Sequence, residues 1–454
     1  MLLSRLPHLV WPALPGPFHA QVIALLHQFE TSQWWQPADL AEQQFRQLAA
    51  LLAHFQASSP FMRPRLEAFN ARLDRRVNAT TLRAIPVLTR ADIRAAGDRL
   101  FNADLPPGQV EWRSSGSSGT TGAPVVVRKT EVGEMFHAAL GLRNHVWHER
   151  DFSGSFAAIR RFPHGTAMGP EGAAGGAWAP GIETGPSFSL NSAFTTLDEQ
   201  LDWLARVRPA ILFSYPSLLH GLALAAERRG MGTGWLRGLM GFGEVATPQQ
   251  RTAITRVFGQ SLRDTYSASE VSTIALQCPE VEGSYHVMAE NVIVELLDRH
   301  GQPCAAGVPG EVVVTDLHNM VTPLIRYAIG DIAEWGPPCA CGRGLPVLRR
   351  IVGRTLHLLR LPDGDALVPD IERQDLHLLA PLREVQVVQH GFADIEVRLA
   401  MDRLPTADEQ AALSAAVRHG LHDRDFALRF TTMAAIPRAE SGKFEAFLCA
   451  MPPA

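Results

Sequence analysis

The chain has 454 residues, of which 46% are hydrophobic, and a formal net charge of -4. This length and composition predict a soluble globular protein of about two or three domains. The chain has no basic excess, which excludes a typical nucleic-acid-binding protein. Residues 1–18 contain Arg5 and four prolines, so neither a signal peptide nor a membrane span is expected there, and no later stretch is apolar for long enough to cross a membrane. The five cysteines are spread unevenly, form no disulfide framework and favour a reducing cytoplasm.

Lysine is rare in this chain. Of the 42 basic residues, only Lys129 and Lys443 are lysine, so arginine serves wherever a positive charge alone is needed. A lysine that remains is expected to place a compact ammonium group at one atom, which a planar guanidinium cannot do. Both lysines are therefore candidate functional residues.

The first part of the chain has helical periodicity. Apolar residues recur at helical spacing over residues 16–75 with few turn signals, which predicts a helical section, residues 1–80, that packs on the main domain. Residues 86–94 are expected to form a short extended piece followed by a helix capped at Thr89.

Residues 112–122 are rich in glycine and hydroxyl side chains and precede an apolar run that is expected to form a strand. The glycines free the backbone to turn its N–H groups toward one point, and the hydroxyl groups add donors without negative charge. Such a loop suits a phosphate, although its spacing matches neither the P-loop nor the GxGxxG fingerprint. The alternative is a flexible linker. The candidate phosphate-binding residues are Ser117, Ser118, Gly119, Thr120, Thr121 and Gly122.

The middle of the chain alternates between predicted helices and strands. A helix is expected from about residue 131 to 146. Residues 150–200 are dominated by glycine, proline and alanine between Gly165 and Pro186, and we give equal weight to a long surface loop and to a mobile wall of a substrate pocket. From Leu201 onward, a helix–strand–helix–strand pattern predicts a parallel or mixed sheet with helices on its faces.

Strand ends carry further candidate residues, because ligands of open α/β sheets bind at the carboxyl ends of strands. Residues 213–217 and 241–244 form such ends, and residues 263–270 form an exposed turn after a helix. Residues 287–335 predict the alternating strands of a small β section. The last part of the chain predicts a small α+β unit that ends in a loop at residues 437–443.

Four residues form a candidate metal site. Cys278, His286, Cys339 and Cys341 would bring three sulfurs and one imidazole together if their segments pack side by side. This ligand set suits tetrahedral structural zinc. Cys304 is a rival ligand, and the alternative is that the cysteines are small buried hydrophobic residues. The zinc would link β elements and take no part in the chemistry.

Several motifs resemble those of one superfamily, in the same order from about residue 112 to 445. Ser118-Gly-Thr-Thr-Gly-Ala-Pro124 resembles the phosphate loop of the adenylate-forming acyl ligases, which include acyl-CoA synthetases, luciferases and peptide-synthetase adenylation domains. Further resemblances lie at Gly241–Glu244, Tyr266–Glu270, Arg326–Asp331, Gly353–Arg354 and Pro437–Lys443. The two cysteine segments resemble the phenylacetate-CoA ligase branch, some members of which hold such a metal.

The resemblance implies an α/β fold with two domains. Residues 1–354 would form a large N-terminal domain of mixed β-sheets flanked by helices plus a small β section, which binds ATP and the acid. Residues 355–454 would form a smaller mobile α+β C-terminal lid domain that rotates at about residues 354–357.

The resemblance also implies the role of each site residue. Gly243 and Glu244 would lie along the adenine, and Tyr266, followed by Ser267, would stack on it. Asp331 and Arg354 would hold the ribose, since a carboxylate orients two hydroxyl groups strongly. Glu270 would hold Mg²⁺ against the phosphates, and Lys443 would contact the attacking carboxylate and the α-phosphate.

The activity implied is ATP-dependent formation of an acyl-adenylate, followed by transfer of the acyl group to coenzyme A. Tyr215 and Gly243 are assigned to the acid pocket, whose aromatic setting favours an aryl or other hydrophobic carboxylic acid. An amine or a carrier-protein thiol as acceptor, and a non-catalytic nucleotide-binding protein, are the alternatives. A homodimer is left open.

Three departures from the family pattern concern the phosphate loop, the hinge and residues 150–200, which do not match the aryl-acid pocket expected of a phenylacetate enzyme and leave the substrate open. Ala123 and Val125 stand where many members carry lysine, which leaves pyrophosphate to backbone amides and to Lys129. His357 stands at the usual hinge aspartate, so the rotation of the lid would be tuned differently.

Overall fold

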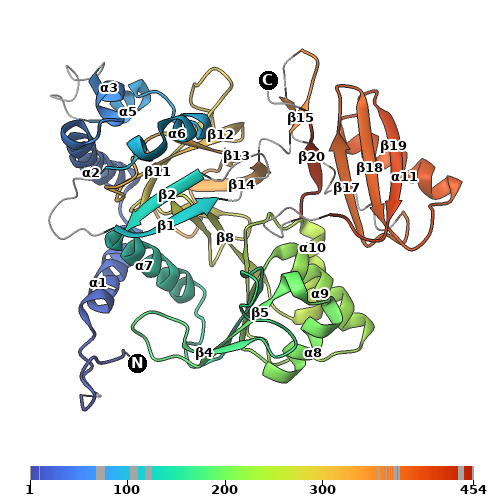
Figure 1. The fold of residues 1–454 in the computed structure, drawn as a ribbon, viewed down its shortest axis with the longest axis horizontal. Helices are drawn as coiled ribbons and strands as arrows, with labels where there is room; N and C mark the ends of the chain where they lie inside the picture. Colours follow the sequence, from blue (N-terminus) through green and yellow to red (C-terminus); the bar gives the residue numbers. More distant parts are fainter. Residues whose placement is uncertain are drawn as a thin grey trace.

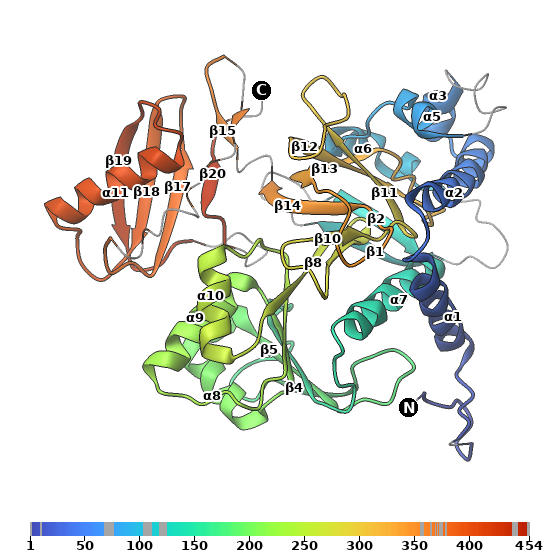
Figure 2. The ribbon, with the colours of Figure 1, turned by 180° about the vertical axis from the view of Figure 1, so that it is seen from behind.

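The computed structural model describes residues 2–9, 11–67, 77–102, 111–117, 125–354, 358–363, 366–367, 369, 371, 376, 379–437 and 444–451. Figures 1 and 2 show N-terminal helices, a body built around a large sheet, and a small C-terminal unit. Within these residues, no helix combines the length and the apolar character that a membrane crossing requires. The fold is of the mixed α/β class that the sequence predicts.

The N-terminal section is helical, as predicted. It comprises α1 (Pro17–Ser32), α2 (Pro37–Ser58), α3 (Met62–Glu67), α5 (Ala79–Ala84), α6 (Arg90–Ala96) and the short helix η1 (Gly97–Leu100). The predicted cap at Thr89 is confirmed, because Thr89 Oγ1 accepts a hydrogen bond from the Asp92 N–H (3.1 Å) and Asp92 Oδ2 accepts one from the Thr89 N–H (2.8 Å). This reciprocal capping box fixes the start of α6.

The body is one mixed sheet of 12 strands in the order β11-β12-β13-β14-β10-β9-β8-β7-β6-β3-β5-β4. The strands are β3 (Phe156–Arg160), β4 (Ala173–Ala177), β5 (Pro186–Asn191), β6 (Ile211–Ser214), β7 (Gly238–Phe242), β8 (Leu262–Ala268), β9 (Ser272–Gln277), β10 (Tyr285–Val287), β11 (Val292–Leu297), β12 (Pro309–Asp316), β13 (Tyr327–Trp335) and β14 (Val347–Arg354). From β5 through β3, β6 and β7 to β8 the neighbours are parallel. The carboxyl ends of these strands therefore meet at one edge.

Helices cover the two faces of the parallel part differently. The helices concerned are α7 (Glu131–Trp147), α8 (Leu197–Val207), α9 (Pro216–Arg228) and α10 (Pro248–Phe258). On one face, Ile159, Leu212 and Leu239 pack in a buried cluster with side chains of α8, α9 and α10. Toward the other face lies α7, whose Asn144 Nδ2 donates to Thr265 Oγ1 at 2.9 Å.

Residues 150–200 do not form a long surface loop, so that interpretation is wrong. This region supplies β3, β4, β5 and the short helix η2 (Ser192–Phe194) to the body. The alternative interpretation, a pocket wall, agrees with the positions of Phe162, His164 and Phe194, which line the cleft described below.

Smaller sheets complete the fold. The apolar run after the glycine-rich loop forms β2 (Val125–Thr130), as predicted, and pairs antiparallel with β1 (Glu111–Ser117). A further hairpin joins β15 (Leu359–Arg360) to β16 (Ala366–Leu367).

The C-terminal unit is the predicted α+β element. Its four strands have the order β19-β18-β17-β20. The elements are β17 (Glu384–Gln389), β18 (Asp394–Ala400), α11 (Ala407–Gly420), β19 (Ala427–Met433) and β20 (Phe447–Cys449). The unit has its own buried core, which includes Val387, Val397 and Leu413, and Figure 1 shows it beside the body with β20 on the inner side.

Candidate active site

A cleft of 1940 Å³ is lined by both the body and the C-terminal unit. Its walls come from the carboxyl ends of β6, β7 and β8, from β13 and β14, and from residues 444–447. The predicted site residues that line it are Tyr215, Gly243, Glu244, Tyr266, Ser267, Glu270 and Asp331. The fold thus brings residues from distant segments to one place.

Two of the predicted nucleotide-binding residues contact each other. The Tyr266 hydroxyl donates a hydrogen bond of 2.8 Å to Asp331 Oδ2, and Tyr266 is only 8% exposed. Asp331 lies directly across the β13–β14 ladder from Arg354. Tyr266 and Asp331 therefore meet at one edge of the cleft, and the backbone of Arg354 lies beside Asp331.

Glu270 is buried with a ring of donors around its carboxylate. It is 2% exposed, and its Oε1 accepts hydrogen bonds from Arg90 Nη2 (2.9 Å) and the Tyr327 hydroxyl (3.1 Å), while Oε2 accepts from Ser269 Oγ (2.9 Å). Carboxylate oxygens in such a setting are ligands of the kind that Mg²⁺ prefers.

Arg90 is a site residue that the sequence interpretation missed. It is the first residue of α6, it lines the cleft, and its contact with Glu270 spans 180 positions of the chain. No local pattern indicates a partner that far away. In the sequence, Arg90 differs from the other arginines only in that it directly follows the predicted helix cap Thr89.

Glu244 connects the body to the C-terminal unit. Gly243 before it has a φ of +76°, a left-handed conformation that favours glycine. Glu244 Oε2 accepts a hydrogen bond from the Ser217 N–H in the first turn of α9 (3.0 Å), and Oε1 accepts one from the Phe444 N–H (2.8 Å). Phe444 is the residue that follows Lys443 in the sequence.

The pocket next to Glu244 has an aromatic wall. Tyr215 and Phe242 line the cleft with ring centroids 4.7 Å apart, and Phe213, which is not among the lining residues, stacks on Phe242 with centroids 4.2 Å apart. Burial is the main cause that raises the pKa of the Tyr215 phenol, so the phenol stays neutral at physiological pH. A planar apolar group fits this wall.

Some predicted residues lie outside the described part of the chain. They are Ser118, Gly119, Thr120, Thr121, Gly122, Ala123, His357 and Lys443. Ser117 ends β1 and Arg354 ends β14, where the backbone alone is described. Lys129 is buried, and its Nζ donates to Ser272 Oγ at 2.9 Å. It is not among the described residues that line the cleft, and its part in pyrophosphate binding stays a prediction.

The four predicted metal ligands meet in one cluster. The ligand atoms of Cys278, His286, Cys339 and Cys341 all lie within 4.8 Å of one another. The Cys339 and Cys278 sulfurs are 3.8 Å apart, and Cys341 Sγ lies 3.3 Å from His286 Nε2. Tetrahedral zinc with Zn–S of about 2.3 Å separates such atoms by roughly 3.5–3.8 Å. The cluster therefore fits zinc.

The rival ligand Cys304 is not part of the cluster. Its thiol contacts the Pro309 carbonyl oxygen at 3.6 Å. Burial lowers the pKa of His286 to about 4, so its imidazole is neutral at physiological pH, the form in which it binds a metal.

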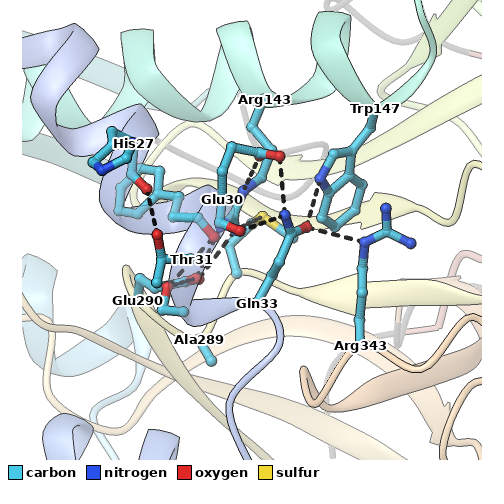
Figure 3. Close-up of polar contacts among 12 residues, drawn as sticks. His27, Glu30, Thr31, Gln33, Arg143, Trp147, Ala289, Glu290 and Arg343 are labelled. Atoms are coloured by element: carbon cyan, nitrogen blue, oxygen red, sulfur yellow. Dashed lines mark hydrogen bonds and ion pairs between the residues drawn. The ribbon is translucent and has the colours of Figure 1, made fainter.

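A polar network, drawn in Figure 3, connects the end of α1 to α7 and to Arg343, which lies in the same loop as Cys341. Gln33 Oε1 accepts hydrogen bonds from Trp147 Nε1 (2.9 Å) and from Arg343 Nε (3.0 Å), two residues after Cys341. Arg143, fully buried in α7, donates to Glu290 Oε1 at 2.9 Å. The N-terminal helix is therefore held against the cysteine-containing loop.

Comparisons with known proteins agree with this geometry. The sequence model of the family described as AMP-binding enzyme matches residues 117–321. Phenylacetate-coenzyme A ligase of Escherichia coli is 26% identical over 392 residues, which cover 82% of this chain and 85% of the relative. Phenylacetate-coenzyme A ligase of Thermus thermophilus is 25% identical over 368 residues, covering 77% of this chain and 79% of the relative.

Among solved structures, 2-hydroxyisobutyryl-CoA ligase in the postadenylation state, in complex with 2-HIB-AMP, has the same fold. It superposes with a TM-score of 0.74 at 17% identity, over 92% of this chain and 91% of that chain. Residues 117–321 therefore match an AMP-binding enzyme domain, and the similarity to phenylacetate-coenzyme A ligases over about four fifths of the chain supports an AMP-forming ligase of the adenylate-forming superfamily, in its phenylacetate-CoA ligase-like branch.

Proposed function

We propose that the protein uses ATP to convert a carboxylic acid into an acyl-adenylate and then transfers the acyl group to the thiol of coenzyme A. The observation that carries this proposal is the hydrogen bond between Glu244 and the Phe444 N–H. It brings the residue after Lys443 into the cleft that Tyr266, Glu270 and Asp331 also line. Coenzyme A is the acceptor named for both curated relatives.

In the first step, a carboxylate oxygen attacks the α-phosphorus of ATP in line with the leaving pyrophosphate. Lys443 would place its ammonium between the two negative groups, and residues 117–122 would hold the β- and γ-phosphates. Asp331 and Arg354 would orient the ribose. Glu270 would coordinate Mg²⁺, and the bound ion would neutralise negative charge on the phosphates. Catalysis of this kind consists of positioning and charge stabilisation.

In the second step, the C-terminal unit would rotate at about residues 354–357 and withdraw Lys443. The thiolate of coenzyme A then attacks the acyl carbon, a C–S bond forms, and AMP leaves with the electrons of the broken C–O bond. This rotation would break the hydrogen bond between Glu244 and the Phe444 N–H. Hinged domain motions commonly replace such local contacts with new ones.

The acid is proposed to have an aryl or other hydrophobic body. The Tyr215 and Phe242 rings, with centroids 4.7 Å apart, provide an apolar aromatic wall that the Phe213 ring supports by stacking on Phe242. Such a wall favours planar groups over charged or strongly hydrated ones.

Structural zinc is proposed for the cluster of Cys278, His286, Cys339 and Cys341. The cluster would connect β9, β10 and the loop before β14, and none of its four residues is among those that line the cleft. The zinc would therefore stabilise the fold.

The experiment that tests the proposed function is ATP–pyrophosphate exchange with a panel of aryl and alkyl acids, without coenzyme A. We expect acid-dependent exchange, followed by thioester formation when coenzyme A is added. Amines and a carrier-protein thiol are offered in parallel as acceptors. Nucleotide binding without exchange for any acid would identify a non-catalytic nucleotide-binding protein instead.

A further inference from the structure

Three neighbouring strands end with side chains on the same side of the sheet. In the register of β3, β6 and β7, Ile159 lies beside Ser214, and Ser214 lies beside Gly241. Ile159 points into the cluster under α8, α9 and α10. Because side chains alternate along a strand, the next residues, Arg160, Tyr215 and Phe242, point to the opposite side, where all three line the cleft.

Arg160 places a cation in the part of the cleft that Tyr215 and Phe242 also line. Its guanidinium lies over the Phe162 ring, 4.1 Å from the centroid, and Nη1 makes one long contact of 3.5 Å with the Arg161 carbonyl oxygen. A ring on the guanidinium plane leaves the N–H edge able to bind a ligand. Among the residues that the structure describes, no carboxylate forms an ion pair with Arg160 or Arg161.

The position of Arg160 is fixed by the loop that follows it. Asn191 is fully buried, and its Oδ1 accepts a hydrogen bond from the Phe162 N–H (3.2 Å) while Nδ2 donates to the carbonyl oxygens of Phe162 (3.0 Å), Pro163 (3.3 Å) and Thr166 (3.2 Å). A buried amide that satisfies four backbone groups holds the loop in one conformation. The ring under the guanidinium is thus pre-positioned.

Burial also makes this cation costly without a ligand. Desolvation is the main cause that lowers the pKa of Arg160 below its ordinary value. Several carboxylates elsewhere in the cleft have their own cationic partners, such as Arg90 for Glu270 and Arg251 for Asp264. An anionic group on the substrate would supply the negative charge that Arg160 lacks among the described residues of the cleft.

We propose that the acid activated by this enzyme has a planar body and a second anionic group, and that Arg160 binds that second group while Tyr215 and Phe242 contact the body. This inference rests on the proposed function and narrows its substrate class to aryl acids with an additional carboxylate or a comparable anion. Guanidinium–carboxylate contacts are directional and bidentate. Arg160 therefore determines substrate specificity. The carboxylate that is adenylated is bound by the groups around the phosphates.

The test compares matched acids in ATP–pyrophosphate exchange without coenzyme A. The three carboxyphenylacetate isomers are set against the three nitrophenylacetates, which are neutral and similar in shape. For at least one isomer, we expect kcat/KM of the carboxy acid to exceed that of the nitro acid by about 10-fold or more. In Arg160→Leu we expect the ratio of kcat/KM between each carboxy acid and its nitro counterpart to fall to about one, with no rise in KM for ATP. Arg160→Lys retains part of the preference.

The control variant is Arg228→Leu, which removes an exposed arginine of α9 that does not line the cleft; it should retain the preference. If nitro acids react and no carboxy isomer surpasses its counterpart in the unmodified enzyme, the inference fails while the proposed function stands. A loss in Arg160→Leu that is equal for all acids, with a raised KM for ATP, overturns the inference by assigning Arg160 to the nucleotide. If no acid of either panel supports exchange, the proposed function fails and this inference with it.

Discussion

The Tyr266 hydroxyl and Asp331 Oδ2 are joined by a hydrogen bond of 2.8 Å. This bond connects β8 to β13 at the cleft and orients the carboxylate that we assign to the ribose. The ring and the hydroxyl of Tyr266 would therefore have separate roles in the proposed site, because the ring would provide a flat surface for the base and the hydroxyl positions a neighbouring carboxylate.

Tyr266→Phe separates these two roles. The ring remains, but Asp331 loses a hydrogen bond to its charged oxygen, a contact worth about 1.5–3 kcal/mol. We expect KM for ATP to rise about 10-fold in pyrophosphate exchange, with little change in KM for the acid. An unchanged KM for ATP would show that Asp331 needs no such support.

Arg90→Gln tests the ion pair with Glu270. Removing one partner leaves a carboxylate that is 2% exposed without its cation, which costs about 3–5 kcal/mol for a buried pair. We expect a lower thermal midpoint and loss of adenylation. The double variant Arg90→Gln with Glu270→Gln should recover stability and remain inactive; a double variant as unstable as the single one would contradict the pairing.

Lys443→Ala should separate the two half-reactions. Without the ammonium, acyl-adenylate formation is expected to fall by at least about 10²–10³-fold, as for other single electrostatic contacts to a transition state. Thioester formation from a supplied acyl-adenylate should be preserved, and this second assay is the internal control. Equal loss of both half-reactions would contradict the proposed role.

Cys341→Ser tests the metal cluster. We expect the purified protein to contain about one zinc per chain, and the variant to lose it and to melt about 5 °C or more below the parent. Cys304→Ser is the matched control, because Cys304 lies outside the cluster, and it should keep the metal. Full zinc content in Cys341→Ser would exclude this ligand set.

Buried histidines predict a dependence of stability on pH. Burial lowers the pKa of His145 to about 3 and that of His318 to about 4. Between those values and about 6.5 the unfolded chain binds protons that the folded chain does not, so stability falls as pH decreases, with a limiting slope of about 1.4 kcal/mol per pH unit for each imidazole. Thermal midpoints measured from about pH 7.5 to about pH 5 should decrease, and His318→Gln should reduce the slope. A flat profile would contradict this account.

Local signals in the sequence predicted much of this fold. Thr89 with Asp92 three positions later specifies a helix start within four residues, and the apolar run at 125–130 specifies β2. The same holds for β6 and β7, whose apolar residues and terminal turns led to Tyr215 and Glu244. These features depend on neighbours in the chain and were predicted from it.

The strands of residues 150–200 were missed for a physical reason. β4 consists of alanine and glycine and is exposed along its whole length, so it has no hydrophobic alternation. β3 is identified only by its partners β5 and β6, which lie 30 or more residues later. Arg90 was missed for the same reason, because its role exists only in contact with Glu270.

Glu244 uses its two oxygens on two parts of the molecule, the start of α9 and the backbone at Phe444. Any displacement of Phe444 leaves one of these oxygens without its donor, beside the wall where the acyl group is proposed to lie. If the acyl group occupies this wall as proposed, it lies beside that oxygen and would change the free energy of opening. We therefore expect turnover to vary with the acid even among substrates that are adenylated equally fast.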